Sequence, residues 1–154
     1  MPEPADDLAQ DLALGFDYGK RRMGIAVGNA IVGTAKALQA LEHIAGQPDW
    51  ERLDALVDQW GVGIFVVGLP LDKDGTNQKM TNRARNFSEE LWGRYKRPVH
   101  LMDERYSTIE ARERLAAARA SGSRGKRLAK GDSDAMAAQV ILERWLQNDI
   151  KDTV

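Results

Sequence analysis

The hydrophobic and polar positions of this chain follow two patterns, short apolar runs and longer stretches of helical spacing. Residues 12–17 and 23–28 predict strands, because residues 12–16 and 23–27 are apolar runs of the kind typical of strands buried on both faces of a sheet. Gly19 lies in the short segment between them, where it favours a tight turn. Residues 31–38 predict a third strand, and residues 41–47 predict a loop. The first part of the chain therefore predicts an antiparallel meander.

Helical and strand patterns alternate after this meander. Helical spacing of apolar residues predicts helices, and uninterrupted apolar runs predict buried parallel strands. The predicted helices cover residues 49–60, 77–93, 107–120 and 133–147, and the predicted strands cover residues 64–69 and 99–102. Asp49 is the expected N-cap of the first of these helices, and Gly93 marks the expected end of the second. This order predicts an α/β fold, with a mixed five-stranded sheet of antiparallel and parallel strands flanked by helices.

Composition and the N-terminus restrict the class of protein. The 154 residues contain no cysteine, which excludes a disulfide framework and a cysteine-based zinc site. The acidic N-terminus lacks the basic and apolar regions of a signal peptide, and no apolar run approaches the roughly 20 residues of a membrane span. We expect a cytoplasmic protein without a membrane segment. We also expect a flexible acidic tail, residues 1–11, followed by a single domain over residues 12–150.

Acidic residues follow the ends of two predicted strands and open the last predicted helix. Asp17 ends the first strand, and Asp103 and Glu104 follow the last strand. The carboxyl ends of parallel strands share one edge of a sheet, where α/β proteins bind their ligands. Asp134 lies on the same helical stripe as the core-facing residues, so it points toward the sheet. We expect Asp17, Glu104 and Asp134 to converge at this edge.

Each of these acidic residues also has a purely structural interpretation. An Asp that ends a strand is often a turn residue, and Asp134 could serve only the dipole of a helix that Ser133 caps. Asp132 lies toward the preceding loop, where it would be solvated or capping. Successive residues of a strand face opposite ways, so one of Asp103 and Glu104 enters the site, and we favour Glu104. Whether Asp103 or Asp132 also binds a metal stays open.

Three converging carboxylates are typical ligands of a hard divalent cation, and we expect Mg²⁺ or Mn²⁺. Two such ions, about 4 Å apart, can activate water and stabilise the leaving oxygen of a phosphodiester. Basic residues flank the acidic ones, as contacts to nucleic-acid phosphates would. The candidate phosphate contacts are Lys20, Arg21, Arg22, Arg105, Arg124, Lys126, Arg127 and Lys130. Arg105 has an alternative role in an ion pair with Asp103, and Tyr18 and Tyr106 are candidates for stacking on bases.

A family resemblance is carried by four segments, GFDYGKRRMGIAVGN, IFVVGLPLDKDGT, HLMDERYSTIEAR and DAMAAQVILERWL. In their order and spacing they resemble the YqgF family, also called RuvX, of pre-16S rRNA nucleases. These proteins were earlier described as Holliday junction resolvases, within the ribonuclease-H-like superfamily. The resemblance implies a ribonuclease-H-like fold, metal-dependent hydrolysis of phosphodiester bonds, and maturation of the 5′ end of pre-16S rRNA during ribosome biogenesis. It also implies pre-16S rRNA, or the assembling small ribosomal subunit, as the partner.

The resemblance assigns roles to single residues and also shows where this chain departs from the family. Carried over by motif, Asp17, Glu104 and Asp134 become the catalytic and metal-binding carboxylates. The family usually has a small hydroxyl residue where this chain has Lys20, and a basic and apolar loop where it has Asp132 and Ser133. Many ribonuclease-H-like enzymes also carry their second acidic residue on an earlier strand than the one before Glu104.

Other functions remain open from the sequence alone. The DYGKRRMGIA string also resembles the first phosphate loop of sugar kinases and actin-like ATPases, but those proteins have two such lobes and are much longer. A Holliday junction resolvase that acts on branched DNA is an alternative nuclease. A non-catalytic protein that binds RNA or the ribosome is another alternative. Nothing in the sequence identifies a dimer surface, so the oligomeric state stays open.

Overall fold

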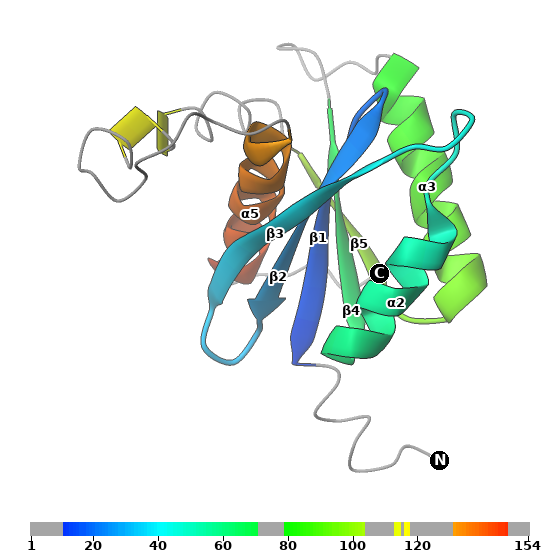
Figure 1. Cartoon of the computed structure of the whole chain (residues 1–154). Helices are drawn as coiled ribbons and strands as arrows, with labels where there is room; N and C mark the ends of the chain where they lie inside the picture. Colours follow the sequence, from blue (N-terminus) through cyan, green and yellow to red (C-terminus); the bar gives the residue numbers. More distant parts are fainter. Residues whose placement is uncertain (1–10, 71–78, 104–112, 115, 118–130, 148–154) are drawn as a thin grey trace, which may run out of the picture.

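A mixed five-stranded sheet forms the centre of the molecule (Figure 1). The computed structural model describes residues 11–70, 79–103, 113–114, 116–117 and 131–147. The strands are β1 (Leu12–Tyr18), β2 (Arg22–Asn29), β3 (Thr34–Glu42), β4 (Ile64–Leu69) and β5 (Val99–Asp103), in the spatial order β3-β2-β1-β4-β5. β2 is antiparallel to β1 and β3, whereas β4 is parallel to β1 and β5. The predicted sheet, a meander joined to parallel strands, is confirmed.

Helices cover both faces of this sheet (Figure 1). The helices α2 (Trp50–Trp60) and α3 (Lys79–Tyr95) pack on one face, and α5 (Asp132–Gln147) packs on the other. Side chains of β1 alternate between the two faces. Leu14 and Phe16 belong to the core beneath α2 and α3, and Ala13 belongs to the core beneath α5. Burial on both faces explains why β1 is an uninterrupted apolar run in the sequence.

Small residues in β1 and β2 let α5 approach the sheet closely. A Cβ atom on Gly15 would lie 2.8 Å from the Cβ of Leu142, and one on Gly28 would lie 2.9 Å from a methyl carbon of the same leucine. Real Cβ atoms do not approach other atoms this closely, so a larger residue at either position would displace the helix. The glycines therefore set the depth at which α5, and with it Asp134, lies on the sheet.

The predicted boundaries of the third strand are wrong. β3 lies further along the chain than the predicted range, 31–38, and extends into the predicted loop, 41–47. Ile31 and Val32 belong to the preceding turn and are 75% and 67% exposed, whereas Leu41 lies in β3 and is 3% exposed. β3 pairs with β2 along its whole length, so the length of its partner sets its bounds more strongly than its own apolar residues do.

Helix bounds agree with the prediction except at the end of α3. Asp49 caps α2 as predicted, and its side chain accepts a hydrogen bond from a backbone N–H of the first turn. The predicted end at Gly93 is wrong, because α3 continues through this residue. Lys96 adopts a φ of 54°, and its N–H donates to the carbonyl of Trp92 over 2.9 Å. A residue in the left-handed conformation ends a helix in this way, and here a lysine takes the place that glycine usually occupies.

Several predictions about the ends and the middle of the chain fall outside the described residues. Residues 1–10 of the predicted acidic tail lie outside them, and so does most of the helix predicted at 107–120. The tail and the bounds of the single domain therefore stay predictions. No helix within the described part of the chain is long and apolar enough to cross a membrane.

Candidate active site

Asp17 and Asp134 are brought to the same end of the same sheet face. Along β1, Ala13 packs beneath α5 and Gly15 lies against Leu142 of α5, so Asp17 is the next residue on that face. Asp17 is directly paired with Gly24 of β2. Side-chain positions of such a pair lie about 5 Å apart on one face of the sheet.

Gly24 is covered by the first turn of α5. A Cβ atom on Gly24 would lie 1.8 Å from the backbone carbonyl oxygen of Asp134 and 2.8 Å from the backbone nitrogen of Ala135. The start of α5 therefore lies over the residue that faces Asp17 across the β-ladder. Two of the three predicted carboxylates thus belong to one small region, although 117 positions separate them in the chain (134 − 17 = 117).

Arg22 connects this region to the edge strand. Its Nη1 lies 3.6 Å from Oδ2 of Asp134, and its Nη2 lies 3.9 Å from Oε1 of Glu42, the residue that pairs with it in β3. The side chains of Arg22 and Asp134 are 22% and 32% exposed, so this ion pair is partly screened by solvent. Sequence reasoning treated Arg22 as a phosphate contact and missed its contact with Asp134, because the contact depends on how α5 docks.

The turn between β1 and β2 presents two basic side chains beside the carboxylates. The N–H of Gly19 donates to the carbonyl of Arg22 over 2.9 Å and closes the turn, in which Lys20 and Arg21 are exposed. His43 holds this turn from the end of β3. Its backbone N–H donates to the carbonyl of Arg21 over 2.8 Å, and its Nε2 lies 2.9 Å from the carbonyl oxygen of Gly19. No pattern in the sequence indicates this role of His43.

Tyr18 does not provide a platform for stacking bases, contrary to one sequence-based candidate role. The residue is 9% exposed. Its ring packs against that of His43, with centroids 4.9 Å apart, and against that of Phe87, with centroids 5.0 Å apart. Burial against α3 occupies the ring, as expected for a residue that faces opposite to Asp17 on β1.

Asp103 lies on the face of the sheet opposite to Asp17. Along β5, Val99 packs with the core beneath α2 and α3, and His100 stacks on Trp145 of α5 with ring centroids 5.0 Å apart. Alternation therefore places Asp103 with Val99, on the α3 side. Asp103 is exposed and is not a neighbour of Asp17 on the α5 face. The expectation that Glu104 enters the site in place of Asp103 stays a prediction, because Glu104 lies outside the described residues.

The strand between β1 and β5 brings no acidic side chain to the α5 face. Ile64 and Val66 of β4 pack beneath α5, and Gly68 is the next position on that face. The third predicted carboxylate, Glu104, lies outside the described residues, as do Tyr106 and five of the predicted phosphate contacts. These contacts are Arg105, Arg124, Lys126, Arg127 and Lys130.

The donor set at this end of the sheet fits a hard divalent cation. Asp17 is partly buried, Asp134 is 32% exposed, and both offer carboxylate oxygens from separate elements. Magnesium is commonly held by one or two carboxylates together with water and substrate phosphates. Within the described ranges, no three Asp, Glu or His side chains form a group that could hold a metal ion. Asp132, at the start of α5, lies about 200° around the helix from Asp134 and therefore on another side of it.

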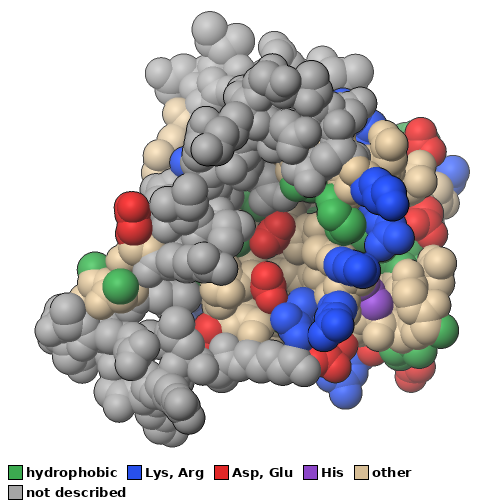
Figure 2. Space-filling view, turned by 90° about the horizontal axis from the view of Figure 1, so that it is seen from above, with side chains coloured by type: hydrophobic (Ala, Val, Ile, Leu, Met, Phe, Trp, Pro, Cys, Tyr) green, Lys and Arg blue, Asp and Glu red, His purple; other side chains and the backbone are tan. Residues whose placement is uncertain are grey.

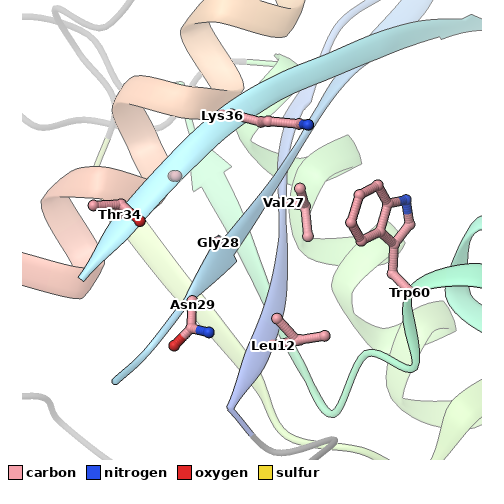
Figure 3. A pocket seen from close by; sticks show the side chains of 8 residues that line it. Leu12, Val27, Gly28, Asn29, Thr34, Lys36 and Trp60 are labelled. Atoms are coloured by element: carbon pink, nitrogen blue, oxygen red, sulfur yellow. The ribbon is translucent and has the colours of Figure 1, made fainter. Parts of the chain in front are cut away.

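Charge is concentrated at this edge of the sheet. Figure 2 looks onto the edge from above and shows Lys and Arg side chains gathered beside acidic ones. A pocket of about 220 Å³ at the opposite end of the sheet has a different character. Figure 3 shows its lining, which includes Leu12, Val27, Lys36 and Trp60 but no acidic side chain. The end of β1 that carries Asp17 is therefore the better candidate for phosphodiester chemistry.

Comparison with known proteins places the chain in a family. A model of the RuvX family, described as a Holliday junction resolvase, matches residues 11–148. The chain belongs to the RuvX family. Relatives named "Putative pre-16S rRNA nuclease" include a protein of Azotobacter vinelandii, 47% identical over 136 residues that cover 88% of this chain and 92% of the relative. Another, from Chromohalobacter salexigens, is 46% identical over 143 residues that cover 93% of this chain and 94% of the relative.

Membership of the RuvX family confirms the resemblance seen in the sequence and the predicted enzyme class, a nuclease that hydrolyses phosphodiester bonds. Solved structures confirm the predicted ribonuclease-H-like fold. T. thermophilus RuvC in complex with a Holliday junction substrate has a TM-score of 0.51 and 14% identity, and the match covers 88% of this chain and 92% of RuvC. A second structure of T. thermophilus RuvC has a TM-score of 0.50, with 88% and 93% coverage.

Proposed function

We propose that this RuvX-family protein is a metal-dependent endonuclease that processes the 5′ end of pre-16S rRNA in the cytoplasm. One observation carries the proposal. Asp17 pairs with Gly24 across the β-ladder, and the first turn of α5, which contains Asp134, lies over Gly24. The names of the relatives from A. vinelandii and C. salexigens support pre-16S rRNA as the substrate. The assembling small ribosomal subunit is then the expected partner.

Asp17 and Asp134, with Glu104 as the third carboxylate, are the residues that would hold Mg²⁺ or Mn²⁺. A divalent ion bound there would supply an activated water and stabilise charge on the leaving oxygen. Arg22, at the start of β2, supports the site through its ion pair with the carboxylate of Asp134. This contact fixes the orientation of one ligand and offsets part of the negative charge where two acidic groups lie close together.

The basic residues would bind the phosphates of the RNA. Lys20 and Arg21 are exposed in the β1–β2 turn, close to Asp17 in the chain, and we expect them to contact phosphates near the cleaved bond. The remaining candidates keep this role as predictions: Arg105, Arg124, Lys126, Arg127 and Lys130. Such contacts position the strand and carry no base specificity.

Cleavage of a precursor 16S rRNA 5′ fragment, with Mg²⁺, Mn²⁺ or a chelator, tests the proposal. We expect cleavage that needs the metal and is lost in Asp17→Asn. Asp58→Asn is the matched control, because Asp58 is an exposed carboxylate on α2, away from the α5 face. Equal cleavage by the wild type and Asp17→Asn would contradict the proposed site. The cleavage would then come from a contaminating nuclease or from other residues of the protein.

A four-way DNA junction belongs in the same assay, because the family model is described as a Holliday junction resolvase. Metal-dependent cutting of the junction, with the precursor RNA left intact, would replace RNA by branched DNA as the substrate. The role of Asp17 would be unchanged in that case.

A further inference from the structure

A polar cleft lies on the other side of the β1–β2 turn from the carboxylates. It has a volume of about 310 Å³ and is lined by residues of the turn, the segment before α2 and helix α3. Its lining residues are Tyr18, Lys20, Gly46, Gln47, Arg83, Asn86 and Glu90. The sequence predicted a phosphate contact for Lys20 but did not predict that Lys20 lies near residues of α3. No sequence pattern links Arg83 to the β1–β2 turn.

The cleft and the candidate active site lie on opposite faces of the sheet at the same end of β1. Tyr18 and Asp17 are successive residues, so Tyr18 faces α3 and Asp17 faces α5, with Cα atoms about 3.8 Å apart. Lys20 projects from the turn that joins the two sides. A nucleic-acid strand that extends from Asp17 across this turn would reach the cleft on the other side.

The charges in the cleft favour a phosphate. Lys20 and Arg83 are exposed and contribute two positive charges, against one negative charge from Glu90. Arg83 and Glu90 both act on the phenol of Tyr18, whose pKa is raised by burial and by the charge of Glu90, while Arg83 opposes the rise. The two charged groups of α3 therefore lie near the same wall of the cleft.

A nucleobase is a poorer occupant than a phosphate. The Tyr18 ring is buried and already packs against the rings of His43 and Phe87, so it offers little surface on which a base could stack. Asn86 and Gln47 offer amide donors that suit phosphate oxygens or ribose hydroxyls. Apart from Glu90, the polar side chains of the lining are therefore cations and neutral donors, and its aromatic ring is buried.

We propose that this cleft, with Arg83 and Lys20 as its cations, is a backbone subsite that binds a phosphate of the nucleic-acid strand beyond the cleaved bond. The identity of the ligand, a single nucleic-acid strand, rests on the proposed nuclease function. Glu90 limits its affinity, since a carboxylate in the cleft repels the phosphate.

Binding of a mixed-sequence single-stranded RNA, measured in chelator on the Asp17→Asn full-length chain, tests this subsite without any cleavage. Arg83→Gln is expected to weaken binding and to lower the slope of log Kd against log salt by about 0.7, the value for one phosphate contact on a single strand. Arg85→Gln is the matched control, because Arg85 is an exposed arginine of the same helix that lines a different pocket. It is expected to leave the slope unchanged.

A second pair of variants tests the sign of the charge effect. Glu90→Gln is expected to tighten RNA binding, whereas Glu89→Gln, at an exposed neighbouring position outside the cleft, is expected to leave it unchanged. Equal losses in Arg83→Gln and Arg85→Gln would overturn the subsite, and so would the absence of RNA binding by the starting protein. Adenosine monophosphate that binds with the same dependence on Arg83 would also overturn it, because the cleft would then take a free nucleotide. Failure of cleavage in the separate assay would not alter these binding comparisons.

Discussion

The backbone of Asp134 lies directly over Gly24, so that a Cβ atom on this glycine would be 1.8 Å from the carbonyl oxygen of Asp134. Asp17 is the residue paired with Gly24 across β1 and β2. One close approach between a strand and a helix therefore brings together two carboxylates from opposite ends of the chain. The proposed catalytic site depends on the absence of a side chain at position 24.

Gly24→Ala is predicted to destabilise the protein by about 3 kcal/mol or more, because backbone atoms of α5 cannot move aside as a flexible side chain could. It should also abolish cleavage, since the start of α5 must shift. Gly93→Ala is the control: Gly93 lies within α3, and a Cβ atom there would meet nothing within 4 Å. This change is expected to stabilise by about 0.5–1 kcal/mol. Urea unfolding measures both values, and equal effects of the two substitutions would contradict the packing argument.

Arg22→Gln is predicted to lower cleavage about tenfold to a hundredfold, because it frees the carboxylate of Asp134 from its contact 3.6 Å away. The free energy of unfolding should change by at most about 1 kcal/mol, since the pair is partly exposed. Arg21→Gln is the matched comparison, one residue away and exposed. It should weaken RNA binding and reduce its salt dependence. If Arg22→Gln behaved like Arg21→Gln in both assays, Arg22 would be a phosphate contact, as the sequence first suggested.

An ion pair far from the site gives the protein a pH-dependent contribution to stability. Arg94 donates to both carboxylate oxygens of Asp54, over 2.9 and 2.6 Å, and the hydroxyl of Tyr95 donates to Oδ1 over 2.6 Å. The hydrogen bond from Arg94 is the main cause that lowers the pKa of Asp54 to about 2, below its usual 3.8. A lowered pKa in the folded state stabilises the protein above pH 3.8, and this contribution is lost as the pH falls toward 2.

Asp54→Asn is therefore predicted to lower the free energy of unfolding by up to about 1 kcal/mol at neutral pH, a small value because both side chains are about 40% exposed. The difference from the wild type should vanish between pH 4 and pH 2. Thermal unfolding at a series of pH values measures this, with Asp58→Asn as the control on the same helix. A difference that stayed constant down to pH 2 would contradict the assigned pKa.

The buried strands were predictable because their environment leaves a simple pattern in the sequence. β1, β2 and β4 are covered on both faces, so each is an apolar run, and their positions agree with the prediction. β3 is an edge strand, and apolar content misled the prediction there: Ile31 and Val32 are apolar but exposed in a turn. Asn29 holds this turn, because its side-chain Oδ1 accepts hydrogen bonds from the backbone N–H groups of both residues. The order of apolar and polar residues over 31–38 contains no information on these hydrogen bonds.

The candidate site was predictable in part for a similar reason. Asp17 ends an apolar run and Asp134 lies on a helical stripe, so local patterns indicate where each side chain points. The contact of Arg22 with Asp134 and the cleft shared by Lys20 and Arg83 depend on how elements distant in the sequence pack together. Periodicity contains no information on such packing. The roles of Asp17, Glu104 and Asp134 in catalysis stay predictions until they are measured.

Mn²⁺ binding to the wild type, Asp17→Asn and Asp134→Asn, measured by calorimetry in the absence of nucleic acid, tests the central claim most directly. If the two carboxylates share a divalent-ion site, each substitution should weaken Mn²⁺ binding by at least about tenfold, and Asp58→Asn should leave it unchanged. The account would be contradicted if Asp17→Asn and Asp134→Asn both bound Mn²⁺ as tightly as the wild type does. Asp17 and Asp134 would then not be metal ligands.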